Sequence, residues 1–154
     1  MTAKVDLPTV RKAAYAIKRG NKIGEGAYRA VYKTKSGKWV YKVNTGYGTG
    51  IGSNGSEYAT YVSVKNSVKL PDGVKLPEMH MVGEYIAAEY VDGEHPTNWC
   101  SPGPYGFHDN GCPGVDTCWA AKVNDVKIND LHPYNVMVTK DGTVYIIDLG
   151  HGEK

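Results

Sequence analysis

The chain has 154 residues, 41% of them hydrophobic, and a formal net charge of +2 at pH 7. This length allows one domain with a useful buried core and excludes two full lobes. The small charge argues against nucleic-acid binding, and the sequence has no apolar run of the length of a membrane span or a signal peptide. We therefore expect a cytoplasmic protein without nucleic-acid or membrane partners.

The first expected element is a helix over residues 7–19, ended by Gly20. Asp6 or Thr9 would cap its first turn, where Pro8 is tolerated because the first N–H groups of a helix have no partner. An apolar face at helical spacing would be formed by Val10, Ala13, Ala14 and Ile17.

Three antiparallel strands are expected next, over residues 22–28, 30–35 and 38–43, with a Ser36–Gly37 turn between the last two. Residues 45–56 carry five glycines and predict a loop. Ser56 would cap the following short helix, which runs from Glu57 to Val64. Two more strands are expected at 79–82 and 85–89.

The last third of the chain predicts an irregular segment over residues 95–115, then a helix over 117–127. Two apolar, β-rich runs follow, at 136–139 and 143–147, around an Asp141–Gly142 turn. They predict a hairpin whose open end would bring together the residues just outside it.

Asp130, Asn135 and Asp148 are the candidate residues for phosphoryl transfer. This reaction requires a carboxylate that orients a hydroxyl nucleophile, here Asp130, and oxygen ligands for Mg²⁺, here Asn135 and Asp148. His132 lies in the same segment, and we expect it to form structural hydrogen bonds rather than to act as a base.

Four residues nearer the start are candidates for holding nucleotide phosphates. Gly24 and Gly26 would let backbone amides approach phosphates, although a plain hairpin turn explains them as well. Lys42 would reach the phosphates from its strand, unless it is an exposed strand lysine. Glu57 would pair with Lys42 and also suits the first turn of a helix.

Together these motifs resemble the protein kinase-like superfamily in their order and spacing. Residues 24–31 resemble its phosphate-binding loop, although Arg29 replaces the third glycine, and Lys42 and Glu57 resemble its conserved ion pair. Residues 89–93 resemble the hinge, in which Glu89 and Val91 would bind adenine through their backbone.

The C-terminal motifs carry the same resemblance. Residues 129–135 are closest to the D-x-H-x-x-N loop of aminoglycoside and choline phosphotransferases, and residues 148–150 match the metal-binding D-F-G. Ile128 and Asn129 stand where protein kinases have His and Arg. Only four residues follow Gly150, so no activation segment or helical substrate platform is expected.

The resemblance implies an α+β fold, with a kinase-like N-lobe of a five-stranded antiparallel sheet and a helix, and a truncated C-lobe stub. It implies one minimal domain over residues 1–154. Its parts would be an N-terminal helix at 1–21, the N-lobe at 22–93, a Cys-containing insert and helix at 94–127, and a catalytic loop with a metal-binding hairpin at 128–154.

The function implied is a phosphotransferase that uses ATP and Mg²⁺, with a protein Ser/Thr as first choice of acceptor and a small alcohol or aminoglycoside as second. Its size would suit the small genome of a phage. The alternative is a pseudokinase, a kinase-like module that binds a partner or host protein without turnover.

Three cysteines lie in the irregular segment and just after it, together with His95 and His108. Three thiolates and an imidazole would form a tetrahedral Zn²⁺ site, with Cys100, Cys112, Cys118 and His108 as ligands. The spacing matches no common paired zinc motif, so reduced thiols remain an alternative. A disulfide would leave one cysteine over.

Overall fold

The structure is a computed structural model that describes residues 7–25, 29–34, 37–44, 54–128, 131–147 and 149. The chain divides into two compact units. The first unit comprises residues 1–58 and 78–90, and the second unit comprises residues 59–77 and 91–154. No helix in the described ranges is both long and apolar enough to cross a membrane.

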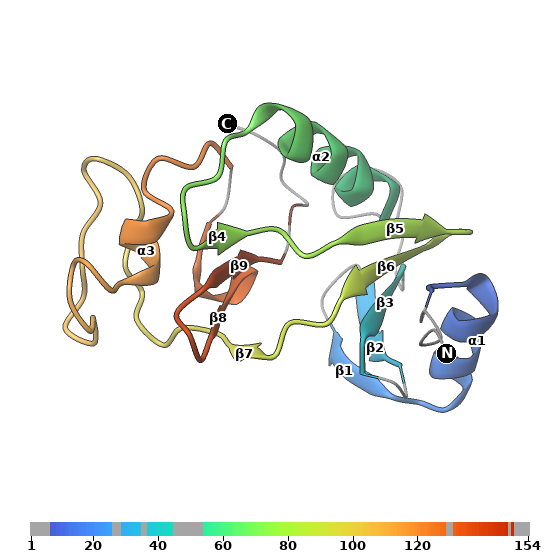
Figure 1. Cartoon of the computed structure of the whole chain (residues 1–154). Helices are drawn as coiled ribbons and strands as arrows, with labels where there is room; N and C mark the ends of the chain where they lie inside the picture. Colours follow the sequence, from blue (N-terminus) through green and yellow to red (C-terminus); the bar gives the residue numbers. More distant parts are fainter. Residues whose placement is uncertain are drawn as a thin grey trace, which may run out of the picture. The chain divides into compact units, whose positions relative to one another are not determined.

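The first unit is built on a five-stranded antiparallel sheet with the order β1-β2-β3-β6-β5 (Figure 1). This confirms the α+β class and the expected five-stranded antiparallel sheet. The strand bounds are Lys22–Glu25 for β1, Arg29–Lys33 for β2, Trp39–Asn44 for β3, Met79–Val82 for β5 and Tyr85–Glu89 for β6.

β3 is the central strand, and its first four residues, 39–42, are all buried. Side chains alternate between the two faces of a strand, so Trp39 and Tyr41 share one face and Val40 and Lys42 the other. Burial on both faces means that neither face of this strand is open to water. Lys42 is the only one of the four with a charge.

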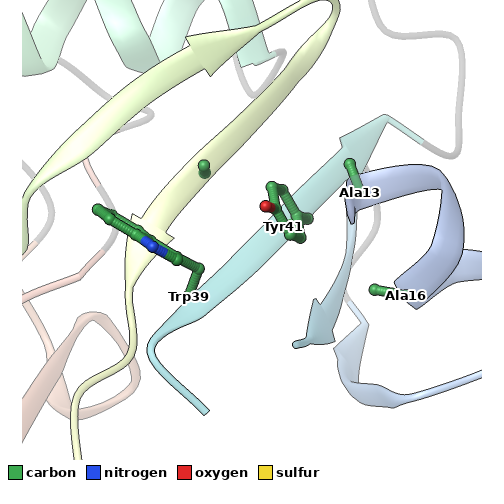
Figure 2. Close-up of a cluster of buried hydrophobic side chains, with 5 residues drawn as sticks. Ala13, Ala16, Trp39 and Tyr41 are labelled. Carbon is green, nitrogen blue, oxygen red and sulfur yellow. The ribbon is translucent and has the colours of Figure 1, made fainter. Parts of the chain in front are cut away.

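The helix α1, Val10–Lys18, packs on the Tyr41 face of the sheet through Ala13 and Ala16 (Figure 2). Alanine has no side chain beyond Cβ, so the helix backbone can approach the aromatic ring closely. Ala13, Ala16 and Tyr41 are exposed by 2% or less. Val10, by contrast, is 50% exposed.

The predicted apolar face of α1 was therefore partly wrong, because Ala14 is exposed and Ala16 takes its place in the core. The predicted cap at Thr9 is confirmed, since its Oγ1 accepts a hydrogen bond from the Lys12 N–H at 3.1 Å. Gly20 has a φ of +69°, the left-handed conformation expected after a helix end. Asp6 lies outside the described residues.

The helix α2, Asn54–Ser67, begins earlier and ends later than the sequence predicts. Ser56 is inside the helix, so its predicted role as the cap was wrong. The first backbone N–H of the helix, from Asn54, instead donates to Asn44 Oδ1 on β3 at 3.0 Å. A partner ten residues away in the chain therefore satisfies the first N–H of this helix.

The second unit contains a four-stranded sheet with the order β4-β9-β8-β7. β8, Val136–Thr139, and β9, Val144–Ile146, form the predicted antiparallel hairpin, and Gly142 in its turn has a φ of +87°. β4, Val74–Lys75, pairs with β9 in parallel, and β7, Gly93–Glu94, pairs with β8. These two short strands were not predicted.

The remaining helices of the second unit are short. α3 covers only Trp119–Lys122, so the helix predicted over 117–127 was too long. A 3₁₀ turn, η1, spans Pro133–Asn135 directly before β8. Trp119 and Ala120 of α3 are buried, so this single turn lies in the core of the unit.

The packing of α1 predicts that enlarging a buried alanine destabilises the protein. Ala13→Leu should lower the free energy of unfolding by about 1–3 kcal/mol, because the added atoms have no room against the sheet. Ala14→Leu on the exposed face of the same helix is the control, and should change it by less than about 0.5 kcal/mol. Urea denaturation measures both, and equal effects would contradict the assigned helix face.

The hairpin turn predicts an unusually acidic carboxyl group at Asp141. Hydrogen bonds from the Thr139 hydroxyl and the Thr143 N–H lower the pKa of Asp141 from 3.8 to about 2. Because the folded pKa is depressed, its stabilising effect is complete above pH 3.8 and is lost as the pH falls through 2. Carboxyl ¹³C NMR should show Thr139→Val moving this titration upward. Titration of the wild-type group near 3.8 would refute the contact.

Candidate functional site

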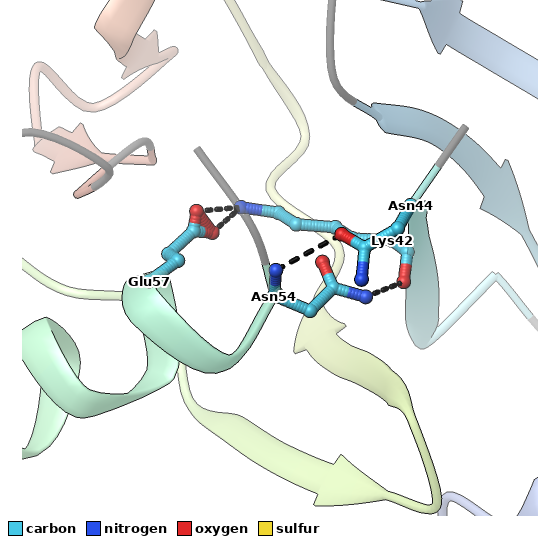
Figure 3. Close-up of polar contacts among 4 residues, drawn as sticks. All are labelled: Lys42, Asn44, Asn54 and Glu57. Atoms are coloured by element: carbon cyan, nitrogen blue, oxygen red, sulfur yellow. Dashed lines mark hydrogen bonds and ion pairs between the residues drawn. The ribbon is translucent and has the colours of Figure 1, made fainter. Parts of the chain in front are cut away.

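Lys42 and Glu57 form a buried ion pair in the first unit (Figure 3). The Lys42 Nζ donates to both oxygens of the Glu57 carboxylate, to Oε1 in a close contact and to Oε2 at 3.2 Å. Lys42 is 8% exposed and Glu57 is 0% exposed. The pair expected from the sequence is therefore present, and Lys42 is not an exposed strand lysine.

Two elements position this pair. Lys42 lies on β3, opposite Val31 of β2 and Ile86 of β6, so the sheet holds its backbone from both sides. Glu57 lies in the first turn of α2, where the helix dipole also favours a carboxylate. The ion pair thus connects the central strand to the start of the helix.

Asn54 is a site residue that sequence reasoning missed. Its Nδ2 donates to the backbone oxygen of Lys42 on β3 at 2.7 Å (Figure 3). It also donates to the backbone oxygen of Glu84, in the turn between β5 and β6, at 3.0 Å, so it fixes the first turn of α2 against a strand and a turn of the sheet. Asn54 is 1% exposed. An asparagine after a glycine-rich segment is a recognised start signal for a helix, and this signal would have found it.

The other candidate nucleotide contacts are partly described. Gly24 lies on β1 at an irregularity in its pairing with β2, and Gly26 lies outside the described residues. The Glu89 carboxylate accepts a hydrogen bond from the Glu78 N–H at 3.1 Å. In the second unit, Val91 is buried and its backbone oxygen accepts from the Gly93 N–H at 3.1 Å.

Asn135 ends the turn η1 and is 6% exposed. Its backbone oxygen accepts from the Ile147 N–H at 2.9 Å, so residue 147 lies beside Asn135 at the open end of the hairpin. Asp148 follows Ile147 in the chain, but it lies outside the described residues, as does Asp130. The structure therefore describes one of the two predicted Mg²⁺ ligands.

Two histidines hold the backbone around Asn135. The His95 Nδ1 lies 2.9 Å from the Val136 oxygen and 3.2 Å from the Pro133 oxygen, the geometry of a ring N–H donating to both. The His132 Nδ1 accepts a hydrogen bond from the Tyr134 N–H at 3.2 Å. The structural role expected for His132 is present, and His95 is a second such residue that the sequence did not indicate.

A Cys–His cluster, formed by Cys100, His108, Cys112 and Cys118, lies elsewhere in the second unit. One potential ligand atom from each of the four residues lies within 4.8 Å of all the others. All three cysteines are free thiols. The grouping expected from the sequence is confirmed: three cysteines and one histidine are within metal-binding distance.

The two buried thiols of the cluster differ in acidity. Burial raises the pKa of Cys118 to about 11. Burial also acts to raise the pKa of Cys100, but hydrogen bonds from the Asn98 amide and the Asp109 N–H outweigh it, and the pKa is lowered. Cys100 is thus the more acidic of the two buried thiols.

No protein-family model, curated protein or solved structure matches this chain. The case for a function therefore rests on the ion pair of the first unit and, in the second unit, on the segment around Asn135 and the Cys–His cluster.

The burial of the ion pair predicts strong dependence of each charge on the other. Lys42→Met should lower the free energy of unfolding by about 3–5 kcal/mol, because it leaves the Glu57 charge buried without a partner. The double variant Lys42→Met/Glu57→Leu should recover most of this loss, since an apolar pair has no charge to desolvate. Urea denaturation measures both variants.

Lys69→Met serves as the control, because Lys69 is an exposed lysine and its replacement should have an effect under about 0.5 kcal/mol. A double variant as unstable as Lys42→Met alone would mean that the lost stability does not come from the unpaired Glu57 carboxylate.

Proposed function

We propose that the protein is a Mg²⁺-ATP-dependent phosphotransferase, a minimal protein Ser/Thr kinase. The observation that carries this proposal is the buried ion pair between Lys42 and Glu57. A buried ion pair often stabilises a fold no better than an apolar pair of the same size. A function for the Lys42 ammonium, such as binding phosphate, is a reason for the chain to keep it there.

In this proposal each candidate residue has one role at the nucleotide. Lys42 binds the α- and β-phosphates, and Glu57 keeps its ammonium in place. The backbone at Gly24 and Gly26 covers the phosphates, and the backbone of Glu89 and Val91 binds adenine.

Gly24 supports the phosphate-loop assignment. Its φ is not positive, and a Cβ added to it would meet no described atom within 4 Å. The described fold therefore does not require glycine at this position. Close approach of a phosphate to the backbone is a reason for glycine that remains.

The proposed chemistry uses three residues of the C-terminal segment. Asn135 and Asp148 would bind Mg²⁺, which neutralises the phosphate oxygens. Asp130 would accept the proton of the acceptor hydroxyl. The hydroxyl oxygen would bond to the γ-phosphorus, and the bond between that phosphorus and the ADP oxygen would break. The products are a phosphate ester, ADP and one proton.

A protein Ser/Thr is the first acceptor to test, and a small alcohol or aminoglycoside is the second. The proposed reaction uses Mg²⁺, whereas the ligands of the Cys–His cluster suit a different ion. Carboxylate and amide oxygens suit Mg²⁺, whereas thiolates and imidazole suit Zn²⁺. We therefore propose Zn²⁺ for the cluster, outside the transfer step.

A partner-binding module without turnover is the second candidate, and exposed aromatic rings in the second unit favour it. Trp99 is 52% exposed and Tyr134 is 63% exposed, and their ring centroids are 5.3 Å apart. Tyr105 and Phe107, from the same irregular segment as Trp99, are 98% and 61% exposed. Exposed aromatic side chains are enriched in protein interfaces.

The test is intact-mass analysis of the protein and of a generic acceptor protein after incubation with Mg²⁺-ATP. The wild type should gain one or more phosphates. Asp130→Asn and Asp148→Asn should each slow the transfer by about 10²–10⁴-fold while leaving the fold intact. Asp72→Asn, at an exposed carboxylate, is the control and should transfer phosphate at the wild-type rate.

Thermal melting with and without Mg²⁺-ATP separates the two candidates. If ATP raises the melting temperature and no phosphate is transferred to proteins, alcohols or aminoglycosides, the protein is a nucleotide-binding module. If ATP neither transfers phosphate nor stabilises the protein, both the kinase and the nucleotide site are refuted.

A further inference from the structure

We infer that the Cys–His cluster is a closed structural zinc site that holds residues 98–118 in shape, with Asn98 as the residue that supports its ligands. The inference rests on the Zn²⁺ proposed for this cluster and not on phosphoryl transfer. All of the residues involved belong to the second unit.

The ligand set and its dimensions fit a tetrahedral zinc ion. A Zn–S bond of about 2.3 Å and tetrahedral angles require sulfur atoms about 3.8 Å apart. The four ligand atoms lie within 4.8 Å of one another, and the Cys112 Sγ is 3.3 Å from the His108 Nδ1. Small side-chain rotations would bring the ligand atoms to this spacing, with His108 binding through Nδ1.

Asn98 provides the second observation that points to a metal. Its buried Nδ2 lies 3.2 Å from both the Cys100 Sγ and the Cys118 Sγ, so one amide group donates to two sulfur atoms. The Asp109 N–H adds a third donor, 3.3 Å from the Cys100 Sγ. A neutral thiol accepts hydrogen bonds only weakly, whereas a metal-bound thiolate carries charge and accepts them well.

The rest of the protein anchors Asn98 itself. Its backbone oxygen accepts a hydrogen bond from the Trp119 Nε1 at 3.1 Å, which ties it to the buried helix α3. Cys118 directly precedes that helix and is 0% exposed, and Cys100 is 4% exposed. The core thus positions two of the four ligands, Cys100 and Cys118, without a bound metal.

The other half of the site lies in a segment that has no core of its own. None of residues 101–117 is buried, and His108 is exposed. The backbone is nevertheless tightly folded, because a Cβ on Gly106 would lie 1.9 Å from the Ser101 oxygen. A folded segment without apolar burial requires another source of stability, and a bound zinc ion supplies it.

The Asp109 carboxylate shapes the segment between the ligands. Its Oδ2 accepts from the Trp99 N–H at 2.6 Å and its Oδ1 from the Gly111 N–H at 3.0 Å. These bonds place the chain before Cys112 next to the chain before Cys100. Asp109 thus brings the exposed ligands toward the buried ones without being a ligand in this set.

The test starts with the metal content of the full-length protein purified without chelator under reducing conditions. We expect one zinc per chain by elemental analysis, and Co²⁺ replacement should give a thiolate-to-metal charge-transfer absorption. Cys112→Ser and His108→Ala should lose the zinc, while His80→Ala, in the first unit, should keep it. Protein that holds no zinc and gives no such absorption with added Co²⁺ overturns the inference.

Asn98→Leu tests the supporting residue. It should weaken zinc binding by about 10–100-fold in competition with a chromophoric chelator. Asn110→Leu, at an exposed asparagine of the same segment, should leave the affinity unchanged. Equal affinity for both variants would refute the role assigned to Asn98.

Limited proteolysis tests the structural role. Chelator treatment should make residues 101–117 at least 10-fold more susceptible to cleavage, and added Zn²⁺ should restore protection. Unchanged cleavage after zinc removal overturns the structural role. Zinc binding by a protein that transfers no phosphate would leave the zinc site standing and count against the kinase alone. Phosphate transfer by a protein that is purified without zinc and gives no absorption with added Co²⁺ would refute the zinc site alone.

Discussion

The first unit depends on one electrostatic constraint: two opposite charges are buried together where the central strand meets the start of a helix. Neither Lys42 nor Glu57 can stay buried without the other, because an unpaired buried charge is strongly destabilising. The first turn of α2 must therefore dock against β3 whenever the sheet forms. Asn54 enforces the same docking through the backbone oxygens of Lys42 on β3 and of Glu84 in the turn between β5 and β6.

The two faces of the central strand have different tasks. On one face Tyr41 packs under the alanines of α1, and this contact is apolar apart from the Tyr41 hydroxyl, which accepts from the Thr9 N–H at 3.4 Å. On the other face Lys42 carries a charge. Because side chains alternate along a strand, the neighbouring residues Tyr41 and Lys42 contact different partners, the alanines of α1 and the carboxylate of Glu57.

The sequence predicted the elements that have a strong local pattern. It did not predict features that depend on residues far apart in the chain. The β2–β3 pairing, the β8–β9 hairpin and the Lys42–Glu57 contact follow from strand patterns and from the order of the motifs. The start of α2 depends on Asn44, a residue from another element, and the two-residue strands β4 and β7 are too short to show any periodicity.

The candidate site shows the same division. His108 joins the three cysteines as expected, but His95, which the sequence also places near them, instead holds the oxygens of Pro133 and Val136. Composition and spacing bring both histidines to one region of the chain. Only the folded backbone decides which ring faces the sulfur atoms.

This difference between the two histidines links the two candidate segments of the second unit, the turn around Asn135 and the Cys–His cluster. His95 holds the backbone on both sides of η1, where Asn135 lies, and three residues further on Asn98 contacts the sulfur atoms of Cys100 and Cys118. A second connection runs through α3, whose Lys122 Nζ donates to the Gly142 oxygen in the hairpin turn at 2.5 Å. A metal that orders the cluster would thereby also restrain the turn η1, which contains Asn135, and the turn between β8 and β9. The irregular segment is then part of the support of the proposed catalytic loop rather than an appendage to it.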